Sequence, residues 1–216
     1  MTGRFHDEIK NLKDEVVAYG EFATAMLHDA LKALKEQDIK LATEVNARKV
    51  DLASWSDDIE ERALRLIALY QPMAQDLRAI ACATRMNVSL YRIGRYGKDI
   101  AILVEDLSTE PHITNMLSIP HMGDLVLEMI GDVMRAYKSG DIVIIENIAE
   151  RDNCVDNLRY SIFREAVSYM MEDPRTITKC TDFVMVARYL ERCGDHACDM
   201  AEKVVYMVSG ERVVYK

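Results

Sequence analysis

The sequence predicts an all-α protein built as two tandem antiparallel three-helix bundles that are related by internal duplication. Apolar residues recur every three to four positions along most of the chain, and no segment alternates with a period of two. Helix breakers are rare, with 9 Gly and 4 Pro in 216 residues. The frame x-Arg-x-Gly-x-x-x-x-Asp occurs at residues 91–99 and again at 191–199, 100 positions later (191 − 91). This spacing indicates a repeat of about half the chain.

The first half carries the pattern of three long helices. Apolar stripes run from Ile9 to Leu34 and from Leu41 to Leu66. The pair Gln71-Pro72 breaks the second stripe, and a proline is well suited to the first turn of the helix that follows. The expected helices lie near residues 5–36, 39–70 and 72–107.

The same pattern returns after a linker near residues 108–120, which contains two prolines. We therefore expect a first repeat at residues 1–108 and a second at residues 109–216. The helices of the second repeat are expected near residues 120–138, 141–171 and 174–208. Helix caps or stops are expected at Asp141, Asp173-Pro174 and Gly210.

The two halves align in register. Arg48 matches Arg151 at an offset of 103 (151 − 48), and Gly94 matches Gly194 at an offset of 100 (194 − 94). Small differences in loop length account for the drift. The short turns predict antiparallel neighbours, hence one three-helix bundle in each half.

Composition narrows the classes of function. The net charge is −9, which disfavours a nucleic-acid partner. Residues 1–108 hold 15 Lys/Arg and 18 Asp/Glu (15 − 18 = −3), and residues 109–216 hold 12 and 18 (12 − 18 = −6). The 5 cysteines form no Cys-x-x-Cys pair, and no apolar run is long enough to span a bilayer. We therefore expect a cytoplasmic protein with reduced thiols and no membrane span.

The second copy of the repeated frame is acidic along one side of its helix. Glu191, Asp195 and Asp199 follow one another at steps of four, and Asp152 and Asp156 show the same step on the preceding helix. Each set continues an apolar stripe, so the carboxylates are expected beside the core, where unpaired negative charge is costly. Bound cations would offset that cost, and oxygen ligands suit Mg, Mn, Fe or Zn. The predicted metal ligands are Asp152, Asp156, Glu191, Asp195 and Asp199.

The alternative interpretation is that these acids face solvent and pair with neighbouring arginines. The candidate partners are Arg151, Arg159, Arg188 and Arg192. His196 is rotated away from the acidic side, so a supporting or surface role is expected for it. Cys154, Cys193 and Cys198 are expected to be small core residues.

Catalytic motifs are missing from the sequence. It contains no Glu-x-x-His pair, no His-Glu-x-x-His zinc motif and no phosphate-binding Gly-x-x-x-x-Gly-Lys loop. We therefore do not expect an enzyme.

With these motifs, the chain resembles the PhoU family over nearly its whole length. The resemblance rests on residues 60–69 with Gln71-Pro72, on Glu150-Arg151-Asp152 with Asp156, and on residues 191–197. It implies two three-helix bundles side by side, with metal ions held by acid-x-x-x-Asp motifs on two helices of a bundle. It also implies a cytoplasmic, often dimeric protein that restrains phosphate import and phosphate-starvation signalling. The implied partners are the ATPase subunit of the phosphate ABC transporter and, in many bacteria, a phosphate-sensing histidine kinase.

The first repeat departs from the acidic pattern. Lys49, Ala53, Tyr91 and Arg95 stand at the positions of Asp152, Asp156, Glu191 and Asp195. We therefore expect no metal in the first bundle. Lys49 and Arg95 are expected either to pair with acids such as Asp99, with a hydrogen bond to the Tyr91 hydroxyl, or to reach solvent.

Taken together, the residues and the resemblance predict a non-enzymatic, metal-binding regulator of phosphate uptake. Two alternatives stay open at the level of sequence. One is a metal-dependent helical-bundle enzyme, either a phosphohydrolase or an oxidase, that uses the same carboxylates. The other is a metal-free helical scaffold.

Overall fold

The computed structural model of the chain describes residues 2–108 and 118–215, and every regular element in those ranges is helical. The first repeat consists of α1 (Thr2–Glu36), α2 (Ile39–Ala47), α3 (Lys49–Tyr70) and α4 (Ala74–Leu107). The second consists of α5 (Ser118–Ser139), the 3₁₀ turn η1 (Ile142–Ile145), α6 (Ile148–Glu172), the 3₁₀ turn η2 (Pro174–Thr176) and α7 (Ile177–Ser209). The predicted all-α fold is confirmed.

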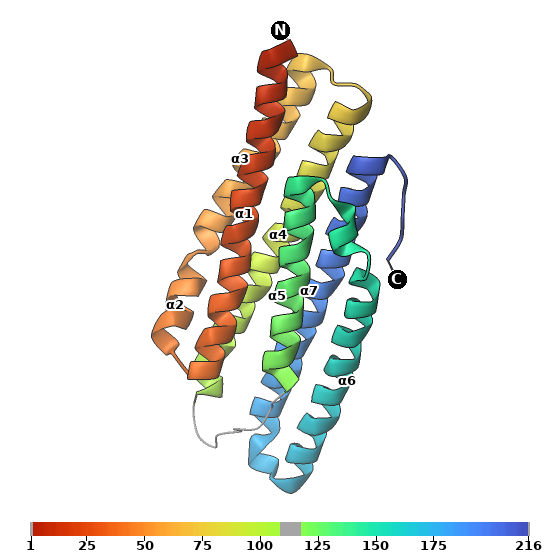
Figure 1. Cartoon of the computed structure of the whole chain (residues 1–216). Coiled ribbons are helices and arrows are strands. Elements are labelled where there is room, and N and C mark those ends of the chain that lie inside the picture. The colour runs from red at the N-terminus through yellow and green to blue at the C-terminus, as the bar shows by residue number, and fades with distance from the viewer. Residues whose placement is uncertain (1, 109–117, 216) are drawn as a thin grey trace.

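Four long helices form the centre of the molecule. Helices α1, α4, α5 and α7 contact one another in the pairs α1·α4, α4·α7, α5·α7 and α1·α5. Helices α2 and α3 lie against α1 and α4, whereas α6 lies on the other side of the molecule against α5 and α7 (Figure 1). Each repeat is therefore a three-helix bundle, with α2 and α3 together taking the place of the second helix in the first repeat, and the two bundles lie side by side.

The apolar stripes of all the long helices meet in one continuous core. A buried tyrosine connects α1 to α3 within it, because the Tyr19 hydroxyl donates a hydrogen bond of 3.1 Å to the Leu52 carbonyl. A second hydrogen bond links the repeats, since the Ser89 hydroxyl on α4 donates to Asp199 on α7 at 3.3 Å. The two bundles thus share one core, and each contributes a face to it.

The helix expected at residues 39–70 is interrupted at Arg48. The Arg48 N–H donates to the Val45 carbonyl at 3.2 Å, a tightened turn that separates α2 from α3. The Arg48 guanidinium also donates to Asp29 on α1 at 2.7 Å. The same ion pair recurs 103 positions later, where Arg151 on α6 donates to Asp132 on α5 at 2.6 Å. This recurrence supports the predicted register of the repeats.

Other predicted boundaries shift as well, most of all the start of α6. The helix expected from residue 141 starts as the 3₁₀ turn η1, which Asp141 caps by accepting from the Val143 N–H, and α6 begins only at Ile148. The helix expected from residue 72 begins at Ala74, since Gln71 takes a left-handed conformation with φ 47°. The helix expected from residue 174 opens as η2. Gly210, with φ 78°, ends α7 as predicted.

Most of the predicted linker, at residues 109–117, lies outside the described residues. Within the described part of the chain, no helix has a stretch long and apolar enough to cross a membrane.

Candidate acidic site between helices α6 and α7

Gly194 lets α6 lie close to α7 at the centre of the repeated frame. A Cβ atom at this position would lie 3.0 Å from an Asp152 carboxylate oxygen and 3.5 Å from Val155. The matching Gly94 in the first repeat instead faces the Leu52 side chain, 2.6 Å from where its Cβ would be. In both repeats, therefore, a glycine allows two helices to pack closely. The side chain that packs against it is a carboxylate only in the second repeat.

Asp152 is half-buried, and its surroundings disfavour negative charge. Burial, followed by the nearby charges of Asp195 and Asp156, raises the pKa of its carboxyl group to about 6, against an opposing effect of the Cys198 thiol. No cation forms an ion pair with Asp152 or Asp156 in the described residues. Asp195 and Asp156 thus lie close enough to Asp152 for their negative charges to disfavour its ionisation.

The other three predicted ligands have cationic partners within the chain. Glu191 is buried and accepts hydrogen bonds from Arg188, and its oxygen lies 3.4 Å from Nε of Arg159. Asp195 pairs with Arg192 at 2.9 Å, and Asp199 pairs with Lys203 at 3.1 Å. The alternative interpretation from the sequence, pairing with arginines, therefore applies to Glu191 and Asp195. Arg151, in contrast, is bound to Asp132.

The donor chemistry suits a hard cation, but the side chains are not arranged as a closed cage. No group of three or more His, Cys, Asp or Glu side chains in the described ranges is close enough together to hold a metal ion. Coordination by Glu191 or Asp195 would require them to exchange an arginine contact for the ion. Asp152 and Asp156 have no such contact to give up.

The first repeat replaces this cluster with a contact between an arginine and a tyrosine. Arg95 donates to the Tyr91 hydroxyl at 3.3 Å, and the guanidinium lies 6.0 Å from the centre of that ring. The expected pairing of Arg95 with Asp99 is not found among the described residues, where Asp99 pairs with its neighbour Lys98 at 2.5 Å. Lys49 is exposed, in agreement with the expectation that this side chain could reach solvent.

The His196 ring lies against an aromatic side chain of α4. Its ring centre lies 6.0 Å from that of Tyr96, which also stacks on Tyr189 at 5.7 Å. Burial lowers the pKa of His196. Sequence reasoning did not identify this aromatic seam, although Tyr96 and His196 are 100 positions apart (196 − 96), the same offset that relates the two copies of the frame.

The cysteines only partly follow the expectation. Cys193 and Cys198 are buried core residues as predicted, whereas Cys154 is exposed on α6. The core side of α6 is taken by Ile148, Val155 and Ile162, and position 154 is rotated away from that side, so its thiol points outward.

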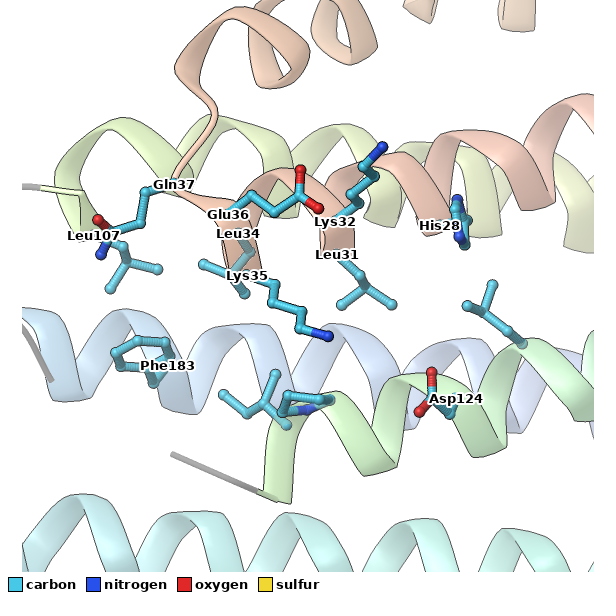
Figure 2. Close-up of a pocket in the computed structure, with 13 residues that line it drawn as sticks. His28, Leu31, Lys32, Leu34, Lys35, Glu36, Gln37, Leu107, Asp124 and Phe183 are labelled. Atoms are coloured by element: carbon cyan, nitrogen blue, oxygen red, sulfur yellow. The ribbon is translucent and has the colours of Figure 1, made fainter. Parts of the chain in front are cut away.

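A cavity of about 410 Å³ lies elsewhere, between the last turns of α1 and α4 and the first turns of α5. Figure 2 shows Lys35 pointing from α1 into this space, with Phe183 of α7 on its far side. None of the five predicted ligands lines it. The acidic site is therefore a feature of the α6–α7 surface and not of this cavity.

Comparison with known proteins identifies the family. The model of the PhoU domain matches the chain twice, at residues 16–104 and 119–204. The chain belongs to the PhoU family. Among curated relatives, the phosphate-specific transport system accessory protein PhoU homolog of Caulobacter vibrioides is 38% identical over 212 residues, covering 97% of this chain and 91% of the relative.

Two crystal structures of PhoU proteins share the fold. PhoU from Pseudomonas aeruginosa matches with a TM-score of 0.90 and 31% identity, covering 96% of this chain and 100% of that one. The phosphate transport system regulatory protein PhoU from Streptococcus pneumoniae matches with a TM-score of 0.89 and 26% identity, covering 97% and 99%. The two-bundle architecture is thus that of experimentally determined PhoU structures.

Proposed function

We propose that this protein is a non-enzymatic regulator that restrains phosphate uptake through the phosphate ABC transporter and limits phosphate-starvation signalling. The observation that carries the proposal is membership of the PhoU family over both repeats, with curated relatives named as accessory proteins of phosphate-specific transport. The proposed partner is the ATPase subunit of the transporter. A phosphate-sensing histidine kinase is a further proposed partner, and the proposed setting is a cytoplasmic homodimer.

Regulation by contact agrees with the chemistry of the described side chains. The acids between α6 and α7 are accompanied by arginines and not by a histidine or another base poised for proton transfer. His196, the histidine nearest to them in sequence, is directed toward Tyr96. This arrangement supports a binding surface more readily than a site of turnover.

We further propose that a divalent or transition metal ion, of Fe, Mn, Zn or Mg type, associates with the second repeat. Asp152 and Asp156 would hold it together with Glu191 and Asp195, and Asp199 is a further candidate. The ion would supply positive charge where carboxylates now repel one another. The raised pKa of Asp152 and the lack of a cationic partner for Asp156 in the described residues support this proposal.

The regulatory proposal is tested by binding the purified chain to the ATPase subunit of a phosphate transporter, with and without added metal. We expect the subunit to be captured and the metal-loaded protein to show no turnover of phosphate esters. An unrelated acidic helical protein, tested for capture of the same ATPase subunit, serves as the control for non-specific binding. Failure of capture under both conditions, or measurable turnover that the Asp152→Ala variant abolishes, would contradict the proposal.

A further inference from the structure

The segment after α7 turns back along the molecule and closes one side of a cavity. Gly210 reverses the chain, and residues 211–215 run beside α7 (Figure 1). The Tyr215 N–H donates to a Glu202 oxygen at 3.1 Å, and Val213 packs against the core. The Arg212 guanidinium lies 5.5 Å from the centre of the Tyr206 ring. The segment is therefore held in place by several independent contacts.

The pocket between α4, α7 and this segment has a volume of about 360 Å³ and a basic lining. It is open to solvent, since Arg85 and Arg212 are both exposed. Arg85 lines it from α4, Lys203 from α7 and Arg212 from the C-terminal segment. Glu202 is the acid among its lining residues, and the Tyr206 hydroxyl is a further polar group. Three cations thus meet one carboxylate, in a chain whose net charge is −9.

The single acid is already engaged, and two of the cations lack a carboxylate partner. Lys203 lies 3.1 Å from both Asp199 and Glu202, and Glu202 also accepts the Tyr215 N–H. Arg85 and Arg212 form no ion pair within the described residues. Their positive charge therefore remains available to an anion that enters the cavity.

A third arginine extends the basic surface along α4. Arg78 lies two turns before Arg85 on the same side of the helix, and its guanidinium carbon is 3.7 Å from the position of a Cβ on Gly210. Its Nε is buried and has no hydrogen-bond partner among the described residues. Arg78 does not line the pocket itself, but it adds a further positive charge beside Gly210, where the C-terminal segment begins.

The internal duplication indicates that helix packing does not require the cations on α4 and α7. At the offset of 100, the positions of Arg78 and Arg85 on α4 correspond to Thr178 and Met185 on α7. In the opposite direction, Lys203 corresponds to Leu103 on α4. Equivalent places in the same architecture thus carry neutral side chains, so helix packing alone does not explain the basic lining.

Guanidinium groups recognise phosphoryl oxygens through paired, charge-assisted hydrogen bonds. We propose that the cavity between α4, α7 and residues 211–215 binds a phosphate-type oxyanion, with Arg85 and Arg212 as its principal contacts and Lys203 and Tyr206 beside them. The anion is either free orthophosphate or a phosphoryl group on a larger anion. The site lies apart from the predicted metal ligands other than Asp199, and the proposal does not depend on the regulatory function.

Equilibrium dialysis of the full chain tests this site, with radiolabelled orthophosphate in one arm and radiolabelled pyrophosphate in the other, at constant ionic strength. We expect saturable binding in at least one arm. The variant Arg85→Gln/Arg212→Gln should weaken that binding by about tenfold or more, since two charge-assisted contacts are lost. The matched control is Arg65→Gln/Arg164→Gln, which removes the same charge from two arginines that are likewise exposed but lie on α3 and α6, and it should bind like the wild type.

The arms also separate the two sources of the phosphoryl group. If the wild type binds orthophosphate and the Arg85→Gln/Arg212→Gln variant does not, the ligand is the free ion. If only pyrophosphate shows this difference between wild type and variant, the ligand is a larger phosphorylated anion. Circular dichroism of both variants checks that the helices are intact. The absence of saturable binding in both arms would overturn the proposal, as would equal weakening by the control variant.

Discussion

The Asp152 carboxylate is half-buried between α6 and α7, and the charges of Asp195 and Asp156 add to the cost of ionising it. An ionised carboxylate in such surroundings opposes folding unless a cation compensates it. The nearby Glu191, in contrast, has two arginines for partners. Asp152 therefore combines a raised pKa with the lack of a cationic partner in the described residues, which makes it the most informative residue to change.

We predict that Asp152→Asn stabilises the metal-free protein at pH 8. The folded-state pKa of about 6 is above the ordinary value of 3.8, so ionisation costs folding free energy at every pH above about 6. That cost is relieved as the pH falls from about 6 toward about 4 and below, where the group becomes protonated in both states. After allowance for solvent screening we expect a gain of about 1–2 kcal/mol at pH 8, measured by urea unfolding.

The control for this prediction is Asp58→Asn on α3, because Asp58 is exposed. It should leave the unfolding free energy within about 0.5 kcal/mol of the wild type. The difference between Asp152→Asn and the wild type should also shrink as the pH approaches about 4. A destabilised Asp152→Asn at pH 8 would show that its carboxylate makes a favourable contact that we have not recognised.

Metal binding should depend on the second repeat alone. At the four corresponding positions the first repeat has Lys49, Ala53, Tyr91 and Arg95, so a cation would meet repulsion there. We expect at least one of Mn, Fe, Zn and Mg to raise the melting temperature of metal-stripped protein, and Asp152→Ala/Asp195→Ala to lose that increase. Asp99→Ala is the matched change in the first repeat and should retain it.

Anomalous diffraction after a metal soak locates the ion directly. A peak next to Arg95 and Asp99 would show that the first repeat has been misinterpreted. An unchanged melting temperature with all four metals would remove the proposed site altogether.

At the scale of the helices, the crossing of α1 over α4 depends on a glycine. A Cβ at Gly97 would lie 2.8 Å from the Leu27 nitrogen and 2.9 Å from its Cα, and both atoms belong to the backbone of α1. Gly97→Ala should therefore force the helices apart and destabilise the protein by about 1–3 kcal/mol. Chemical denaturation measures this loss.

Gly131 on α5 provides the matched control. Apart from the neighbouring backbone of α5 itself, no atom of the described residues lies within 4 Å of a Cβ at that position, and the residue is within a helix. Gly131→Ala should consequently stabilise the protein by about 0.5–1 kcal/mol, because alanine loses less backbone entropy in a helix. Equal effects of the two substitutions would contradict the close α1–α4 crossing.

The long helices could be predicted because their apolar spacing extends over many turns, whereas their short interruptions could not. The break at Arg48 is marked by neither glycine nor proline, since residues 45–50 read Val-Asn-Ala-Arg-Lys-Val, so the local pattern does not reveal it. The 3₁₀ turn at Ile142–Ile145 carries apolar residues that continue the helical stripe, so spacing alone does not separate it from α6.

The candidate site, like the helices, could be predicted only in part from the sequence. The step of four residues was sufficient to place Asp152 and Glu191 on facing sides of two neighbouring helices. Their partners were not predictable, because a flexible arginine has several acids within reach. Arg151 lies next to Asp152 in sequence but binds Asp132 on α5, and that choice depends on the packing of three helices.

At the scale of the whole molecule, the two repeats are joined by a continuous core and a four-helix centre. This common scaffold presents two different surfaces, because the second repeat is acidic where the first has Lys49 and Arg95. A duplicated fold with unlike surfaces suits a protein that acts by contact with other proteins. The proposed restraint of phosphate import relies on such contacts and on no chemical step.

Phosphate accumulation in a strain that lacks the gene tests this restraint most directly. Uptake of radiolabelled phosphate should be measured under phosphate-rich and phosphate-starved conditions, beside the parent strain and a strain complemented with the full-length chain. We expect the deletion to deregulate uptake, with excess accumulation in rich medium that the intact chain reverses. Unchanged accumulation in the deletion strain under both conditions would contradict the proposed restraint.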